Sequence, residues 1–290
     1  MKEDIAPIRG GDMNLGLAAW EGSEKKKPWH YRVSAAIPVL ETYETLEICL
    51  ELLKLQTEKP YIMVIDTGSC GEQFEKMRKL QASDTEVHFL RLNGVHHPSD
   101  FPAMAMELAF AICRTEFIFA THADCFLRKR TFLEEMLEMA QKVSPVVGYE
   151  ISPRQHSDWK GMVSHTASIY HMPTMDKINF GWSLRKLCNM YNIRNYKPDP
   201  MRPNWPDTEI LGNLVLRHNK IKPHLIGSEE NFTRNLDENI DHIRSYTSGK
   251  LYCSKYFARA NEWFEEAKEE ALERIAMWKA EEFKNLLNGA

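Results

Sequence analysis

Short apolar runs alternate with amphipathic stretches along the first half of the chain. The run RVSAAIPVL (32–40) is rich in β-branched and small apolar residues and ends in a proline-containing turn, which is typical of a strand buried in a parallel sheet. The next stretch, ETYETLEICLELLKLQ (41–56), repeats apolar residues every three or four positions. This spacing predicts an amphipathic helix, and Thr42 stands where its N-cap is expected.

The same alternation continues to about residue 150. The segments that follow are YIMVIDTGSCGEQ, GEQFEKMRKLQA, VHFLRLN, PAMAMELAFAICR, EFIFATHADCFL and KRTFLEEMLEMAQK. Strand and helix thus alternate four times, which predicts right-handed βαβ units and an α/β, Rossmann-like, mainly parallel sheet flanked by helices. Ligands of such sheets bind beyond the carboxyl ends of the strands. We therefore expect Asp66, His122 and Asp124 to open into one crevice.

The rhythm changes after about residue 152. The stretch to about residue 205 is irregular and rich in His, Trp, Met, Asn and Pro, as in binding loops. DTEILGNLVLRHN then predicts a helix, IKPHLIG a short strand, and the charged segment from about Tyr252 a long C-terminal helix. The expected organisation is a loosely ordered leader (1–30), a domain (31–250) with halves 31–150 and 151–250, and a helical extension (251–290). The extension packs on the domain or forms a homodimer.

Composition narrows the function classes. The 290 residues are 43% hydrophobic with a net charge of −4 and a pI near 6.3, so no electrostatic footprint for nucleic acid stands out. Six scattered cysteines without a CxxC pair indicate reduced thiols. The start of the chain is unlike a secretory signal, and no apolar run approaches the roughly 18 residues of a membrane span. We expect a cytoplasmic protein without a transmembrane segment.

Four segments together resemble family-two glycosyltransferases. AAIPVLETYETLEICLELLKLQTEKPYIMVIDTGSCGE resembles the opening of that family, and FIFATHADCFLRKRTFLEEML resembles the stretch that carries its Asp-any-Asp motif. PDTEILGNLVLRHNKIKPHLIG is similar to the segment with the catalytic base, and NIDHIRSYTS to the segment with a late histidine. The likeness covers roughly residues 32–248. It implies the glycosyltransferase A fold and transfer of a sugar from a nucleotide diphosphate sugar to a hydroxyl acceptor, with inversion.

The resemblance implies a site for Mn²⁺ or Mg²⁺. Asp124 matches the last Asp of the motif and His242 the late histidine, so both are expected metal ligands. A divalent cation neutralises the charge that builds on the departing diphosphate, and these ions favour oxygen ligands. His122 departs from the family, which usually has Asp there; imidazole binds Mn²⁺ but adds no negative charge. The alternatives are a helix-capping Asp124 and a structural His242.

Other residues are expected to hold the donor, for which a UDP-sugar is favoured. Asp66 matches the family's acidic residue that binds the base or ribose, although a turn-forming aspartate is the alternative. His122 and Ala123 would lie against the donor, and Arg244 could meet the diphosphate. The wall of the base pocket would be formed by Pro38, Val39, Leu40 and Glu41.

An inverting transferase needs a carboxylate that accepts the proton of the attacking hydroxyl. Asp207 falls on the Asp of the family's Glu-Asp pair, with Pro206 in place of the Glu, and Glu209 is the second choice. Alternatively both only start a helix. Aromatic and imidazole rings suited to a glycan or small-molecule acceptor gather in the irregular stretch, although each could be packing; a nucleic-acid acceptor is not indicated. These residues are Trp159, His165, His171, Trp182 and Trp205.

Two other function classes remain at this stage. A nucleotidyltransferase also combines a parallel sheet with an acidic metal site, but IPVLETYETL lacks the glycine-rich, basic loop that would be expected after its first strand. A non-catalytic nucleotide- or glycan-binding module would account for His122 and Pro206.

Overall fold

The computed structural model describes most of the chain between residues 30 and 288. The described ranges are 30–84, 86–92, 100–151, 160–182, 208–230, 233–243, 246 and 254–288. The predicted leader lies outside them, except for its last residue.

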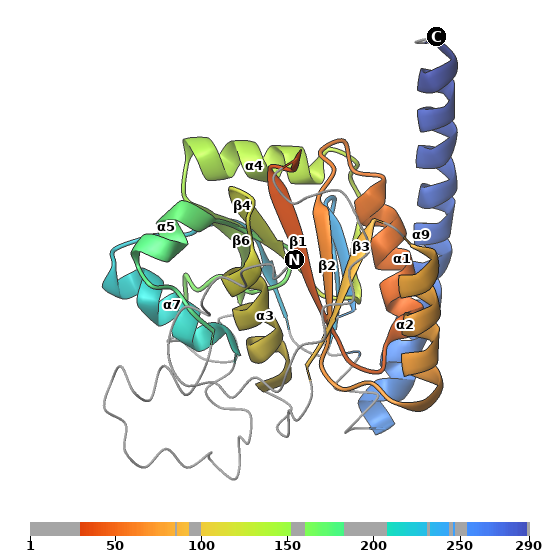
Figure 1. The fold of residues 1–290 in the computed structure, drawn as a ribbon, viewed down its shortest axis with the longest axis horizontal. Coiled ribbons are helices and arrows are strands. Elements are labelled where there is room, and N and C mark those ends of the chain that lie inside the picture. Colours follow the sequence, from red (N-terminus) through yellow and green to blue (C-terminus); the bar gives the residue numbers. More distant parts are fainter. Residues whose placement is uncertain are drawn as a thin grey trace, which may run out of the picture.

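A seven-stranded sheet forms the centre of the molecule (Figure 1), in the order β3-β2-β1-β4-β7-β6-β8. Its strands are β1 (Val33–Val39), β2 (Tyr61–Asp66), β3 (Val87–Arg91), β4 (Phe117–Ala120), β6 (Val146–Ile151), β7 (Ser168–His171) and β8 (His224–Glu229). Strand pairing is parallel except on both sides of β7, which runs against its neighbours β4 and β6. The prediction of a mainly parallel α/β sheet is confirmed.

Helices cover both faces of this sheet, because its strands are apolar on both sides. One core holds buried side chains of α1 (Tyr43–Lys54), α2 (Gly71–Ser83), α4 (Phe132–Lys142) and α9 (Ser254–Asn288). The other core holds side chains of α3 (Asp100–Ile112), α5 (Met172–Lys177) and α7 (Thr208–His218). The result is a three-layer arrangement of helices, sheet and helices.

A second, antiparallel sheet of three strands lies beside the first. It consists of β5 (Cys125–Leu127), β10 (Ile240–Ile243) and β9 (Arg234–Leu236), with β10 in the middle. The sequence EFIFATHADCFL was expected to be one strand with a polar tip, but it contains two strands, one in each sheet. The partner of β5 comes from the far end of the domain, so a local pattern of apolar residues does not reveal the break.

Two further details differ from the sequence-based expectation. The stretch after residue 152 was expected to be irregular, yet its described part contains β7 and α5. Thr42 is the N-cap residue of α1, as predicted, but its side chain makes no capping hydrogen bond. Instead the backbone carbonyl of Thr42 accepts hydrogen bonds from the hydroxyl of Thr45 and the N–H of Leu46.

The long C-terminal helix α9 is confirmed, and its second half rises beyond the rest of the molecule in Figure 1. Buried side chains spaced three to four residues apart, from Ala260 to Trp278, attach it to the core. Arg234 on β9 adds a polar contact, since its guanidinium binds Glu266 and Glu270 of α9 and also Asp241 of β10. Packing of the extension on the domain is therefore observed. Within the described part of the chain, none of the helices is long and apolar enough to cross a membrane.

Candidate active site and metal centre

The carboxyl ends of β2, β4 and β8 lie at the same edge of the central sheet, because these strands run in one direction. Asp66 is the last residue of β2, and Glu229 is the last residue of β8. His122 and Asp124 follow β4 directly. Since β1 is the strand that separates β2 from β4, the topology brings Asp66 and Asp124 to neighbouring positions along this edge.

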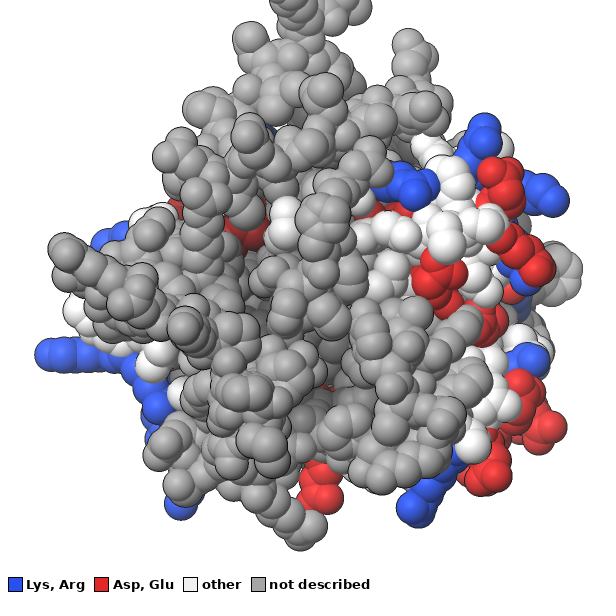
Figure 2. All heavy atoms as spheres, turned by 90° about the horizontal axis from the view of Figure 1, so that it is seen from below, with Lys and Arg blue, Asp and Glu red and all other residues white. Residues whose placement is uncertain are grey.

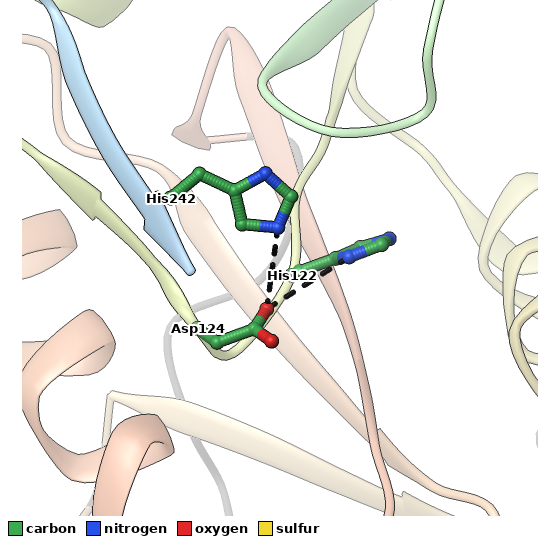
Figure 3. A group of neighbouring side chains, drawn as sticks. All are labelled: His122, Asp124 and His242. Atoms are coloured by element: carbon green, nitrogen blue, oxygen red, sulfur yellow. Dashed lines mark ion pairs between the residues drawn. The ribbon is translucent and has the colours of Figure 1, made fainter. Parts of the chain in front are cut away.

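Asp124, His122 and His242 form one cluster, and their side chains point toward one another (Figure 3). One ligand atom from each residue lies within 4.8 Å of the others. Oδ1 of Asp124 lies 3.5 Å from Nε2 of His242 and 3.9 Å from Nδ1 of His122. Both distances exceed that of a strong hydrogen bond. The three side chains are close enough together for each to offer one ligand atom to a shared cation.

Backbone pairing fixes the positions of these side chains. The turn between β4 and β5 is closed by a hydrogen bond from the N–H of Cys125 to the carbonyl of His122, 3.2 Å long. His242 lies directly opposite Cys125 in the small sheet, and the N–H of Ile243 donates to the carbonyl of Asp124 at 3.1 Å. The late histidine therefore reaches the motif because β10 pairs with β5.

His242 has a second carboxylate neighbour that the sequence analysis missed. Its Nδ1 lies 2.6 Å from Oε1 of Glu229, and both side chains are fully buried. Burial alone would lower the pKa of His242, but the negative charges of Glu229 and Asp124 outweigh it and raise the pKa to about 9. Glu229 follows the predicted strand IKPHLIG by two residues, so the strand-end rule that selected Asp66 also points to it.

A second buried carboxylate–imidazole pair borders the cluster. Nδ1 of His165 lies 2.7 Å from Oε1 of Glu209, which is in the first turn of α7. The ring of His165 also packs on that of His122, with 4.2 Å between the ring centres. The predicted acceptor residue His165 and the second-choice base Glu209 are therefore brought together, next to the predicted metal ligand His122.

Asp66 begins the loop that follows β2, and this loop is hydrogen-bonded to the loop that follows β1. Its Oδ1 accepts hydrogen bonds from the N–H groups of Gly68 and Ser69, while its Oδ2 lies 3.7 Å from Nε of Arg91. Asp66 is thus a turn-forming residue, which was the alternative to a role in donor binding. Because Oδ2 is not used in the turn, a role in donor binding stays a prediction, and Arg91 is a cation there that the sequence analysis missed.

The segment predicted to wall the base pocket is part of the same loop system. Glu41, in a left-handed conformation with φ of 55°, donates its N–H to Oγ of Ser69, and its Oε1 accepts the N–H of Cys70. Val39 is hydrogen-bonded to Thr67 through its carbonyl. Such crossed contacts hold the two loops together, with Pro38 and Leu40 in the same segment.

The remaining predicted residues lie farther out or outside the described ranges. Trp182 is buried, with its ring centre 5.9 Å from that of His165, and packs among Phe110, Tyr170 and Phe180. His171 ends β7 at the opposite end from the cluster, paired with the first residue of β4, and contacts Thr174. The structure does not describe Trp159, Trp205, Asp207 or Arg244.

Figure 2 shows the charged side chains of the described residues on one face of the molecule. Among the described residues, Lys and Arg side chains are interspersed with Asp and Glu on the right-hand side of that view. This agrees with the net charge of −4 and gives no support to a nucleic-acid acceptor.

The family model described as Glycosyl transferase family 2 matches residues 34–198, more than half of the chain. No curated protein matches the chain significantly in sequence.

Two solved structures are similar to parts of this one. The mannosyltransferase PcManGT of Pyrobaculum calidifontis, in complex with GDP-Man and Mn²⁺, is 13% identical with a TM-score of 0.47; the match covers 90% of this chain and 77% of that one. TarS 1–349 of S. aureus is 15% identical with a TM-score of 0.40, and the match covers 52% of this chain and 50% of that one.

Proposed function

The chain belongs to glycosyl transferase family 2, and from that premise we propose that it transfers a sugar from a nucleotide diphosphate sugar with the help of a cation held by His122, Asp124 and His242. That the protein is a glycosyltransferase using a nucleotide-sugar follows from the family. The proposal adds metal dependence, inversion and the residues that carry them. The observation that carries it is the convergence of these three side chains at the carboxyl edge of the sheet.

The donor set fits a divalent transition ion. Two imidazole nitrogens and one carboxylate oxygen come within one coordination sphere, and this mixed set suits Mn²⁺ better than Mg²⁺, which favours oxygen ligands. When bound, the ion would neutralise the negative charge that develops on the diphosphate. Asp124 supplies the only anionic ligand of the triad, so it is the residue on which binding of the ion depends most.

The nucleotide would lie over the joined loops at the ends of β1 and β2. Oδ2 of Asp66 is oriented near Arg91, and a carboxylate there suits a ribose hydroxyl or the N3–H of uracil. Pro38 to Glu41 would form the opposite wall, and His122, Ala123 and Arg244 would lie along the diphosphate. We favour a UDP-sugar for this reason.

The proton acceptor of the transfer is assigned to Asp207, with Glu209 as the second choice. Glu209 is buried and already paired with His165, so it is less free than a solvent-facing carboxylate to accept the proton of an incoming hydroxyl. Glu209 pairs with His165, and the ring of His165 packs on that of His122, so we infer that the start of α7 lies beside the proposed metal centre. Asp207, immediately before α7, would then be close to the reacting sugar.

The acceptor would enter from the side of residues 151–250, as a glycan or small molecule. His165 and Trp182 are the described aromatic and imidazole rings on that side, and Trp159 and Trp205 would extend the surface.

A homodimer through α9 would cover the exposed side chains of Met277, Phe283, Leu286 and Leu287. A cytoplasmic location stays a prediction from the cysteine pattern; the described cysteines Cys49, Cys70, Cys113 and Cys125 are free thiols.

Donor binding tests the proposal directly. Calorimetric titration with UDP-, GDP- and dTDP-sugars should give binding of at least one donor in Mn²⁺ and much weaker binding in EDTA. The Asp124→Ala protein should behave in Mn²⁺ as the wild type does in EDTA. Equal donor affinity in Mn²⁺ and in EDTA would show that the cation has no part in donor binding.

A further inference from the structure

Glu229 contacts His242 of the cluster formed by His122, Asp124 and His242. This contact has no role in the function proposed above. Its carboxylate lies 2.6 Å from Nδ1 of His242, and neither side chain is exposed to solvent. The two residues come from different sheets, since β8 is an edge strand of the large sheet and β10 is the central strand of the small one. The contact therefore joins the two sheets at the metal centre.

The contact determines which nitrogen of His242 is presented to the cluster. With Nδ1 donating to Glu229, Nε2 is the atom left to bind a cation, and Nε2 is the one that lies 3.5 Å from Asp124. A metal-binding imidazole commonly donates its other N–H to a carboxylate, which fixes the ring orientation and makes the imidazole a stronger ligand.

A fully buried carboxylate is costly unless a partner compensates for its lost hydration. Glu229 is completely buried at a strand end, where an apolar residue of similar size would avoid this cost. The burial of Glu229 beside His242 is explained if the pair serves cation binding. The cation would then add positive charge to a site that holds two carboxylates, Asp124 and Glu229.

We propose that Glu229 is a positioning residue of the metal centre: it holds His242 so that Nε2 binds the cation, and it strengthens that bond through Nδ1. This proposal rests on the proposed function, because it requires that His242 and Asp124 bind a cation. Glu229 itself touches neither the cation nor the substrate. Its effect passes through the imidazole ring.

The test is cation binding by the full-length protein, measured without any substrate. Titration with Mn²⁺, followed by electron paramagnetic resonance of the free ion, gives the dissociation constant for wild type and for Glu229→Gln. The glutamine still accepts the hydrogen bond of Nδ1 but carries no charge, so the ring keeps a partner. We expect Mn²⁺ binding to weaken by about 10- to 100-fold. Glu230→Gln, at the next position in the chain, is the matched control and should bind Mn²⁺ as the wild type does.

The outcomes separate the two proposals. Wild type that binds no Mn²⁺ would overturn both the metal centre and the role of Glu229. Wild type that binds Mn²⁺, with Glu229→Gln binding equally well, would overturn the role of Glu229 alone and leave the metal centre in place.

A measurement on the wild type keeps the proposal testable if Glu229→Gln does not fold. Imidazole nitrogens labelled with ¹⁵N report separately on Nδ1 and Nε2 by nuclear magnetic resonance. On addition of Zn²⁺, a diamagnetic probe, we expect Nε2 of His242 to take the shift of a metal-bound nitrogen while Nδ1 stays protonated. Metal binding through Nδ1, or no change at His242, would contradict the proposal.

Discussion

Oδ1 of Asp124 lies 3.5 Å from Nε2 of His242, although the two residues belong to segments far apart in the sequence. The pairing of β5 with β10 creates this proximity, because Cys125, next to Asp124, lies opposite His242. The small antiparallel sheet thus brings a late histidine to the end of a central parallel strand. The predictions below follow from this geometry.

Replacing Asp124 should remove the cation without unfolding the protein. Asp124→Ala deletes the only anionic side chain of the triad, and we expect Mn²⁺ affinity to fall by at least about 100-fold, the upper end of the loss seen for an outer-shell partner. The backbone hydrogen bond from Ile243 to the carbonyl of Asp124 is retained, so the circular dichroism spectrum should be that of wild type. Calorimetry with Mn²⁺ gives the affinity, and unchanged binding would exclude Asp124 as a ligand.

Restoring the residue usual for the family at position 122 should change which ion is preferred. His122→Asp adds a negative charge and an oxygen ligand close to Asp124, and both favour Mg²⁺. We expect tighter Mg²⁺ binding and a smaller ratio of Mn²⁺ to Mg²⁺ affinity, measured by competition titration. A ratio that does not change would mean that His122 lies outside the coordination sphere.

The stability of the metal-free protein should depend on the protonation of His242. Its pKa is raised from 6.5 to about 9 in the folded protein, so the folded state binds this proton more tightly than the unfolded state. The resulting stabilisation is fully present below about pH 6.5 and is lost as the pH rises through about 9. In EDTA, the melting temperature of the wild type should therefore fall relative to that of His242→Gln as the pH is raised from 6 to 9.5. A difference in melting temperature between the two proteins that does not change across that range would contradict the raised pKa of His242.

The choice of catalytic base lies between Asp207, just before α7 in the sequence, and Glu209, in its first turn. Asp207→Asn keeps the size of the side chain but cannot accept a proton, so turnover should fall by about 10² to 10⁴ with little change in nucleotide affinity. Glu209→Gln should have a much smaller effect, because Glu209 is buried against His165 and is not the assigned base. Steady-state kinetics and nucleotide binding on both variants test the assignment. The reverse order of effects would identify Glu209 as the base.

Much of the fold could be predicted because its pattern is local. Apolar runs and helical spacing identify β1 to β4 and their helices, and the rule that parallel strands end at one edge assigns Asp66, His122 and Asp124 to the same edge of the sheet. The same rule applied to β8 would have identified Glu229. The apolar pattern of that strand ends at Gly227, two residues before the strand itself ends.

What the sequence did not reveal depends on contacts between distant segments. β5 and β7 pair with strands that approach from elsewhere, and their own sequences are short and without a distinct period. The contact of His165 with both Glu209 and His122 joins the turn after β4, the segment before β7, and α7. Such a contact is fixed by packing, so the scattered positions of the histidines along the chain do not indicate it.

Metal-dependent sugar transfer can be measured as nucleotide release from a panel of UDP-, GDP- and dTDP-sugars by the wild type and by Asp124→Ala, each with Mn²⁺ and with EDTA. The account predicts release of nucleotide from at least one donor, only by the wild type and only with Mn²⁺. Release that continues undiminished in Asp124→Ala or in EDTA would contradict a metal centre built from His122, Asp124 and His242.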